Sequence, residues 1–462
     1  MNRDKYISEL NEIKASKDFQ QKTTELLKNL PTDREPEKKR KPLRLVLVPA
    51  LAVVLVCGLL LSGVLFPLSM VSASENLMNG VSANKIDVQG NMSEDFIRGQ
   101  QDFSVRLFQK SLRKDQNSLV SPVSVSLALG MTANGAGGET LTQFEKLLGG
   151  GMDVTELNRN EYLLANQLKS ITDGKLQIAN SIWYRDKNLK VEKGFLQKNA
   201  DYFGAGAFQL DFGKQSTVNK INGWVKENTG GKIDKMVSQI DDTTMMYLIN
   251  ALYFESDWRI AYKDYQVKDR EFQAPGGKVT VPFMNSQEVY LHDGKSDGIL
   301  KPFQDDRFAL MAVLPKEGVG LDEYIAQMTG ESFAALLDSA GEEWADSFLP
   351  KFKYEFSIGL NDPLKALGLT DAFDADRADF RSMGSSPEGP LFISEVLHKT
   401  FIEVDELGAK AGAATSISMA AGSAAPAQDR KEVVFDRPFL YAIVDTQAKL
   451  PVFIGTVSNP KE

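Results

Sequence analysis

Cysteine and histidine are almost missing from this 462-residue chain, which contains one cysteine and two histidines. A single cysteine cannot form a disulfide within the chain, so no disulfide framework supports the fold. Two histidines leave little room for a histidine-based metal site. Acidic residues outnumber basic ones by 62 to 53, and the net charge of −9 has the wrong sign for a general nucleic-acid binder. We therefore expect no nucleic-acid partner, no metal and no other cofactor.

Long apolar runs are also scarce, and only residues 43–66 are long and apolar enough to span a bilayer. This segment carries one charge, Arg44, and follows the basic run Lys38–Lys41. By the positive-inside rule, residues 1–42 should lie in the cytoplasm and the rest of the chain outside the membrane. The sequence thus predicts a single-pass membrane protein with an extracellular domain. The long leader and the lack of disulfides favour a bacterial cell membrane.

A cleaved signal peptide is the alternative interpretation of this region. Val71-Ser72-Ala73 offers small residues where a signal peptidase cuts, so cleavage after Ala73 would release the domain as a secreted protein. The apolar core is longer than the usual ~7–15 residues of a signal peptide, and this favours a retained anchor. Residues 67–92 are then expected to form a Ser/Asn/Gly-rich linker, followed by one large domain at 93–462.

Catalytic motifs are absent, apart from one that fits poorly. Gly294–Gly298 matches the G-x-S-x-G pattern of hydrolases, in which a strand enters the serine and a helix leaves it. Residues 299–303 are instead strand-like and contain Pro302, so the pattern predicts a polar turn between two strands. His292 lies in the same turn, and nothing in the sequence orients it. No metalloprotease, Walker or paired-cysteine motif occurs, and we expect that the chain is not an enzyme.

The most informative part of the chain lies between two predicted strands near its C-terminus. Residues 394–404 alternate apolar and polar positions and are rich in β-branched side chains, which predicts a strand. Residues 411–428 contain no charge, and 14 of these 18 positions are Ala, Gly, Ser or Thr. Strands are predicted again at 433–444 and 451–457. A flexible linker has this composition, but the strands after it are too few to form a second core.

Alternate residues of this segment form a face without charge. They are Ala409, Ala411, Ala413, Thr415, Ile417 and Met419. Small uncharged side chains on one face would let the segment enter a sheet as a buried central strand, while its other face stays exposed. We therefore interpret the segment as a loop that can become a strand.

Several segments resemble the serpin family of protease inhibitors. Glu406-x-Gly408 and the small residues after it resemble the family's hinge, and Phe435–Phe439 resembles the signature after its reactive loop. Further segments that resemble the family, in the family's order, are 117–124, 219–233, 250–258, 349–352, 364–368 and 453–460. The resemblance covers nearly all of 93–462. It implies a monomeric domain with a mixed α/β fold of three β-sheets, eight or nine helices and an exposed reactive-centre loop.

The resemblance also implies roles for individual residues. The hinge would consist of Glu406, Gly408, Ala409, Ala411, Ala413 and Thr415. A shutter beneath the main sheet would consist of Ser121, Ser124, Asn250 and His398. Trp258 and Glu406 would mark the breach, where the loop enters the sheet. In much of the family the counterpart of Glu406 pairs with a basic residue after the segment resembling 281–284, but Asn285 stands there in this chain.

The mechanism implied by the resemblance is a suicide inhibition. A serine protease attacks the loop and forms an acyl-enzyme, and the cut loop then inserts into the main sheet and traps the protease before deacylation. Non-inhibitory members commonly carry bulky, charged or proline residues on the inserting face. Residues 409–419 carry none on that face, which favours an inhibitor. The alternative is a membrane-tethered binding or structural protein that keeps the fold without inhibiting a protease.

The position of the scissile bond depends on where the count along the loop begins. The family's spacing from the hinge places it near Gly422-Ser423, whereas counting back from Pro438 places it near Ala427. We expect cleavage among Ala421, Gly422, Ser423, Ala424 and Ala425, with the bond before Pro426 disfavoured. These small side chains fit the pockets of elastase-like or subtilisin-like proteases rather than trypsin-like or chymotrypsin-like ones.

Overall fold

The computed structural model describes residues 75–461, except 172, 187–188, 243, 388 and 410–430. The expected cytoplasmic segment, the expected anchor at 43–66 and the expected scissile region therefore lie outside the described residues. Within the described part of the chain, no helix combines the length and the apolar character needed to cross a membrane.

The described residues contain nine α-helices. They are α4 (Glu94–Ser111), α5 (Pro122–Ala133), α6 (Gly138–Gly149), α7 (Val154–Lys169), α8 (Lys193–Tyr202), α9 (Gln215–Asn228), α10 (Leu321–Gln327), α11 (Gly330–Asp338) and α12 (Asn361–Ala366). In α5, Ser121 is the N-cap residue, Pro122 occupies the first turn, and every residue is buried. A helix without a polar face has to lie in the core, and α5 does so.

The main sheet has six strands in the order β11-β13-β14-β5-β2-β4. Their bounds are β2 (Lys175–Arg185), β4 (Gly206–Leu210), β5 (Met246–Asp257), β11 (Phe352–Gly359), β13 (Glu395–Val404) and β14 (Gly408–Ala409). The two central strands run parallel, with Glu395–Lys399 of β13 opposite Tyr247–Ala251 of β5. The strand predicted at 394–404 is therefore present, and it lies in the middle of the sheet.

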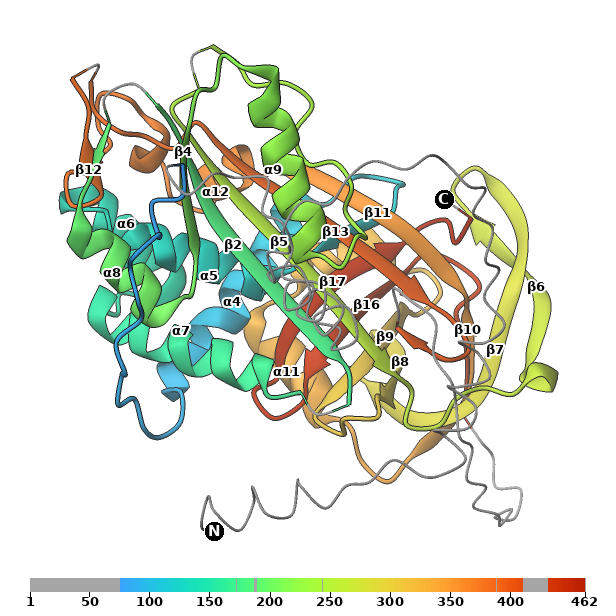
Figure 1. The fold of residues 1–462 in the computed structure, drawn as a ribbon. Coiled ribbons are helices and arrows are strands. Elements are labelled where there is room, and N and C mark those ends of the chain that lie inside the picture. Colours follow the sequence, from blue (N-terminus) through green and yellow to red (C-terminus); the bar gives the residue numbers. More distant parts are fainter. Residues whose placement is uncertain are drawn as a thin grey trace, which may run out of the picture. The chain divides into compact units, whose positions relative to one another are not determined.

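Both faces of the main sheet are covered, as Figure 1 shows, with α9 crossing one face. Alternate residues of β5 point to opposite faces. Tyr247 and Ile249 join a core with α9, whereas Met246 and Leu248 belong to the large core that contains α5. Because a covered sheet buries both faces, β5 shows little of the apolar–polar alternation that marks a half-exposed strand.

A second sheet has nine strands in the order β1-β17-β16-β9-β8-β7-β10-β15, with β6 beside β7. Their bounds are β1 (Ser118–Val120), β6 (Val267–Ala274), β7 (Gly277–His292), β8 (Ser296–Pro302), β9 (Phe308–Pro315), β10 (Trp344–Pro350), β15 (Lys431–Val434), β16 (Phe439–Asp445) and β17 (Leu450–Val457). A third sheet pairs β3 (Lys190–Val191) with β12 (Gly384–Ser385). The expected mixed α/β fold with three sheets is confirmed.

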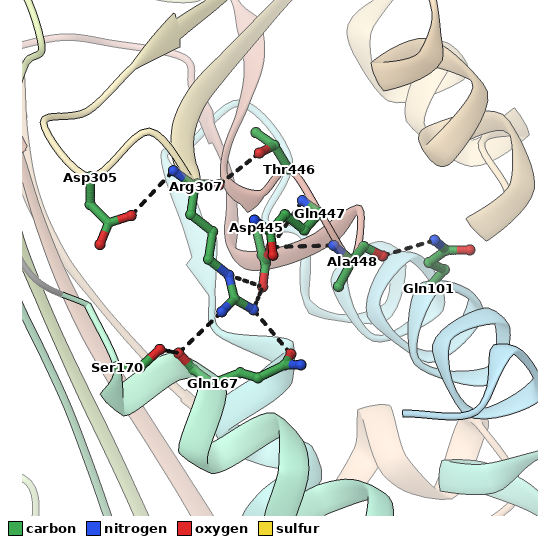
Figure 2. Close-up of polar contacts among 9 residues, drawn as sticks. All are labelled: Gln101, Gln167, Ser170, Asp305, Arg307, Asp445, Thr446, Gln447 and Ala448. Atoms are coloured by element: carbon green, nitrogen blue, oxygen red, sulfur yellow. Dashed lines mark hydrogen bonds and ion pairs between the residues drawn. The ribbon is translucent and has the colours of Figure 1, made fainter. Parts of the chain in front are cut away.

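A buried ion pair between Arg307 and Asp445 ties the second sheet to α7 (Figure 2). Arg307 Nε donates to Asp445 Oδ2 at 3.0 Å, and its Nη2 donates to Gln167 Oε1 at 3.0 Å. The other carboxylate oxygen of Asp445 accepts the amide hydrogens of Gln447 and Ala448. One charged pair thus fixes the end of α7, the start of β9 and the turn between β16 and β17.

Residues 75–78 pack against the outer edge of the main sheet, although we expected them to be part of a linker. Asn76 forms an antiparallel bridge with Phe208 of β4. The Leu77 amide donates to the Ala207 carbonyl at 2.9 Å, and the Gln209 amide donates to the Glu75 carbonyl at 2.8 Å. The described end of the expected linker therefore extends the edge of the sheet.

Candidate functional site

A tight turn links β13 to β14 at the end of the main sheet. The side chain of Asp405 stabilises this turn, because its Oδ1 accepts the amide hydrogens of Leu407 at 2.8 Å and Gly408 at 3.1 Å. The Asp405 amide in turn donates to the Gly408 carbonyl at 3.0 Å. The chain therefore reverses direction over only a few residues and returns along β13.

The two residues of β14 lie between the two central strands. Ala409 pairs with Val404 of β13 and with Ser256 of β5, and Gly408 pairs with Asp257. A Cβ atom at Gly408 would lie 2.2 Å from the Ser256 carbonyl oxygen, so only glycine fits at this position. Ala409 is 1% exposed, and its small side chain is buried in the core. Two of the expected hinge residues thus already occupy the space between β13 and β5.

Trp258 holds the chain at the point where β14 enters the sheet. Its indole N–H donates to the Asp405 carbonyl at 2.8 Å, and its amide donates to the Leu407 carbonyl at 2.9 Å. The ring is 2% exposed and stacks on Phe303, with the centroids 4.6 Å apart. A tryptophan at the end of a strand is usually plain core, but here both of its N–H groups bind the hinge turn.

Glu406 has a basic partner that the sequence analysis did not identify. We noted Asn285 at the position where a basic residue was expected, but Glu406 forms an ion pair with Lys351 instead. Lys351 connects β10 to β11, so the ion pair joins the hinge turn to the edge strand next to β13. The partner is distant in sequence, and no local pattern marks it. Both side chains are about one-third exposed, at 28% and 35%.

The four expected shutter residues lie together beneath the main sheet. His398 Nδ1 is 2.7 Å from Asn250 Oδ1, and its Nε2 accepts the Ser121 amide hydrogen at 3.0 Å. Asn250 Nδ2 donates to the Ser124 carbonyl at 2.6 Å. Ser121 Oγ accepts the Ser124 amide hydrogen at the start of α5. The network therefore joins both central strands to the N-terminus of the buried helix.

The hydrogen bonds of His398 define its protonation state. Because Asn250 Oδ1 only accepts, Nδ1 must carry the proton, and because Nε2 accepts from an amide, it must be unprotonated. The side chain is fully buried, and this burial lowers its pKa to about 3. The imidazole is thus a neutral hydrogen-bonding group rather than a base exposed to a substrate.

Asn180 is a further member of the shutter network that the sequence analysis missed. Its Oδ1 accepts a hydrogen bond from Asn250 Nδ2 at 2.7 Å. Asn180 lies on β2, so the network spans three strands rather than two. The sequence offers no signal that singles out Asn180, because several other polar residues occur in 175–185.

The rest of the expected hinge and the scissile region lie outside the described residues. These are Ala411, Ala413, Thr415 and Ala421 to Ala425. The chain returns at β15, where Lys431–Val434 run parallel to Ala345–Phe348 of β10. The segment 410–430 thus connects the central strands of the main sheet to an edge of the second sheet.

The hydrolase-like pattern at Gly294–Gly298 begins in the expected turn between two strands, and from its serine onward it belongs to β8. Its serine, Ser296, is fully buried and donates a hydrogen bond to Asp293 Oδ1 at 2.8 Å. The residues that follow it form strand β8 rather than a helix. Within the described part of the chain, no cluster of three or more potential metal ligands is present.

Known proteins resemble both the sequence and the fold. The family model described as Serpin (serine protease inhibitor) matches residues 98–460. Serpin-Z7 of Hordeum vulgare is 33% identical over 74% of this chain and 90% of its own length. An uncharacterised serpin-like protein of Thermococcus kodakarensis is 29% identical over 78% of this chain and 84% of its own length.

Comparison with solved structures also finds serpins. The thermophilic serpin tengpin in its native state has 44% identity and a TM-score of 0.79, covering 83% of this chain and 99% of tengpin. A thyroxine-binding globulin in complex with thyroxine has 25% identity and a TM-score of 0.70, covering 79% of this chain and 99% of the globulin. The family model spans most of the chain, and the fold matches that of solved serpin structures. The chain therefore belongs to the serpin family.

Proposed function

We propose that this serpin inhibits serine proteases by a suicide mechanism. The protease cleaves the segment 410–430 and forms an acyl-enzyme, and the hinge side of the cut segment then inserts between β13 and β5 as a new strand. Insertion carries the attached protease away and distorts its oxyanion hole. Loss of one oxyanion donor slows acyl-enzyme chemistry by about 10²–10³-fold, so a modest distortion would trap the ester.

The observation that supports this proposal is the position of Gly408 and Ala409. Both are buried between the central strands, in register with Val404, Ser256 and Asp257. The residues that follow on the same face are Ala411, Ala413 and Thr415, which are small and uncharged. Further insertion would therefore extend an existing strand without burying a charge.

The test is to incubate the full chain with subtilisin and with pancreatic elastase. We expect a covalent complex that survives SDS, with cleavage between Ala421 and Ala425 identified by mass spectrometry of the released C-terminal peptide. A complex with trypsin alone, cut after Arg430, would contradict the proposed target class but not the mechanism. Cleavage by every protease without any trapped complex would contradict the mechanism.

The variant Ala411→Glu tests insertion directly. A glutamate on the inserting face would bury a charge at a cost of several kcal/mol, so the variant should be cleaved as a substrate without trapping the protease. Ala414→Glu is the matched control, because position 414 alternates to the other face and the variant should still inhibit. SDS-stable complexes formed by Ala411→Glu would show that this residue does not enter the sheet.

A non-inhibitory binding protein is the second candidate function, because the same fold occurs in a thyroxine-binding globulin. Melting temperatures of the intact and the loop-cleaved chain separate the two functions. An inhibitor should gain stability on cleavage because the loop joins the sheet, whereas an unchanged melting temperature would favour the binding protein.

We further propose that residues 43–66 anchor the protein in a cell membrane, with the monomeric domain outside. The support is the length of this apolar segment and the basic run Lys38–Lys41 before it. Protease treatment of intact cells should then release the domain as a fragment without residues 1–66. Release only after lysis would contradict this orientation, and a chain that starts at Ser74 would indicate secretion instead.

A further inference from the structure

The exposed large apolar side chains of the described domain gather at one place. Ile260, Tyr265 and Trp344 are 74%, 70% and 53% exposed, respectively, and all three line one cavity of about 470 Å³. We call these three residues the apolar rim. Single exposed apolar residues are ordinary, but a group of them around a cavity marks an interaction site.

The floor of this cavity is a rigid polar cluster. Lys301 and Glu288 form an ion pair at 2.6 Å, and their side chains are only 3% and 7% exposed. Lys301 Nζ also donates to the Ile260 carbonyl and lies 4.2 Å from the centroid of the Tyr262 ring. Glu288 accepts a second hydrogen bond from Ser286. These contacts fix the segment that carries Ile260, so the cavity does not need to form on binding.

Tyr262 forms part of the cavity wall. The residue is 5% exposed and lines the cavity, and its hydroxyl has no hydrogen-bond partner of good geometry. Burial raises the pKa of Tyr262, and the nearby Glu288 carboxylate adds to this rise. The Tyr262 ring, in contact with Lys301 Nζ, therefore belongs to the preformed wall of the cavity.

The apolar rim lies next to both ends of the segment 410–430. At the first end, the Tyr262 amide donates to the Glu406 carbonyl at 2.9 Å in the hinge turn. At the second end, Trp344 precedes Ala345, which is paired with Lys431 where the chain returns. A protease bound to the middle of this segment is therefore kept near the rim by the chain on either side of the bound residues.

The length of the segment limits how far such a protein can stand from the rim. Ala421 and Ala425 precede Lys431 by ten and six residues, so even fully extended chain places the scissile region within ~35 Å of Lys431. A protease domain of ~250 residues has a radius of gyration of about 18 Å. Its surface around the active-site cleft must therefore face the part of the inhibitor that holds Lys431 and Trp344.

We propose that Ile260, Tyr265 and Trp344 form a second contact surface for the target protease, which binds an apolar side chain projecting beside the active-site cleft. This inference rests on the proposed inhibitory function and adds to it a determinant of target choice outside the loop. Contacts at an aromatic anchor beside a preformed pocket commonly dominate a protein interface.

The test uses subtilisin and pancreatic elastase whose catalytic serine is replaced by alanine, so that binding to the full chain is non-covalent. The combined variant Ile260→Ala, Tyr265→Ala and Trp344→Ala should weaken binding to at least one of them by about tenfold or more. The second-order rate constant for trapping the corresponding active protease should fall by a similar factor. The number of proteases trapped per inhibitor should not change, because insertion is untouched. Trp344→Lys should act in the same direction.

The control variant carries Glu139→Ala and Lys146→Ala on α6, which are exposed and do not line the cavity. It should bind both proteases like the unmodified chain.

An apolar-rim variant with unchanged binding and trapping rates would overturn the proposal. A change in the stoichiometry of trapping without a change in rate would overturn it as well. The proposal would also be overturned if the apolar-rim variant sedimented differently from the unmodified chain in the absence of protease, because the rim would then join two copies of the chain. If the unmodified chain binds the inactive proteases without trapping the active ones, the inhibitory function fails independently of the rim.

Discussion

The shutter and the Arg307–Asp445 cluster are both buried polar networks, but they use different chemistry. The shutter consists of neutral amides, hydroxyls and one neutral imidazole, and it spans strands β2, β5 and β13. The Arg307–Asp445 cluster is a charged pair that fixes α7 to the second sheet. Neutral hydrogen bonds contribute about 1 kcal/mol each, whereas breaking a buried ion pair costs several kcal/mol.

The difference matches what each region has to do under the proposed mechanism. Insertion of a strand between β13 and β5 requires the shutter hydrogen bonds that join these two strands to break. Neutral groups can exchange hydrogen-bond partners at low cost. The second sheet has no such requirement, and a charged pair is suited to a junction that stays closed. We therefore expect the two networks to respond differently to removal of one partner. Three measurements test this, and a fourth tests the ion pair of the hinge.

The largest effect is expected for Asp445→Ala. This change leaves the Arg307 guanidinium largely buried without its counter-charge, and it should lower the free energy of unfolding by about 3–5 kcal/mol. The loss should be equal in the intact and the loop-cleaved chain, because the cluster lies outside the main sheet. Urea denaturation of both forms provides the measurement. A loss confined to the intact form would mean that this junction also moves.

A smaller but more selective effect is expected for Asn250→Ala. The change removes the partner of His398, Ser124 and Asn180, and it should cost about 2–3 kcal/mol because buried groups lose their hydrogen bonds. The network holds the two central strands together, so trapping capacity should also decay faster on mild heating. Equal decay rates for Asn250→Ala and an equally destabilised variant of the second sheet would remove the distinction between the two regions.

A pH effect of about 1 kcal/mol should come from His398. Its pKa is lowered to about 3 in the folded chain, so below pH ~6.5 the unfolded chain binds a proton that the folded chain does not. Stability is therefore complete above pH ~6.5 and is lost as the pH falls toward 3. Between pH 7 and 5.5, the unmodified chain should lose about 1 kcal/mol more than His398→Gln.

The smallest effect is expected for the ion pair of the hinge. Glu406→Gln removes a partly exposed pair with Lys351 and should cost less than about 1 kcal/mol. Glu403→Gln on β13 is the control, since it removes the pair with Lys353 on the same sheet. The two variants should have similar stability, but only Glu406→Gln should change the rate of cleavage in the hinge by a non-target protease. Identical cleavage rates would show that Lys351 does not restrain the hinge turn.

Local patterns predicted the parts of the site that are encoded by neighbouring residues. The alternation in 394–404 marked β13, and the small residues after Glu406 marked a segment that fits between strands. The structure places Gly408 and Ala409 there. Family resemblance was needed for Ser121 and His398, because nothing local shows that they meet across 277 residues.

Partners that depend on tertiary packing were not predictable from the sequence. Lys351 and Asn180 each belong to an element that is distant in the chain from the residue they contact. Residues 75–78 were expected to be part of a linker because residues 67–92 are rich in Ser, Asn and Gly and show no helical or strand period. Their backbone pairs with β4 regardless of side-chain pattern, since main-chain hydrogen bonds are available at any sheet edge.

The pairing of Asn76 with Phe208 has a consequence for self-association. β4 ends the six-stranded sheet, and an uncovered edge strand offers unpaired backbone groups to the edge of another copy. The chain before the domain fills part of this edge with its own backbone, and Glu75 adds a salt bridge to Lys220 on α9. A short segment without secondary structure of its own thus occupies backbone groups at this edge that a strand of another copy would otherwise pair with.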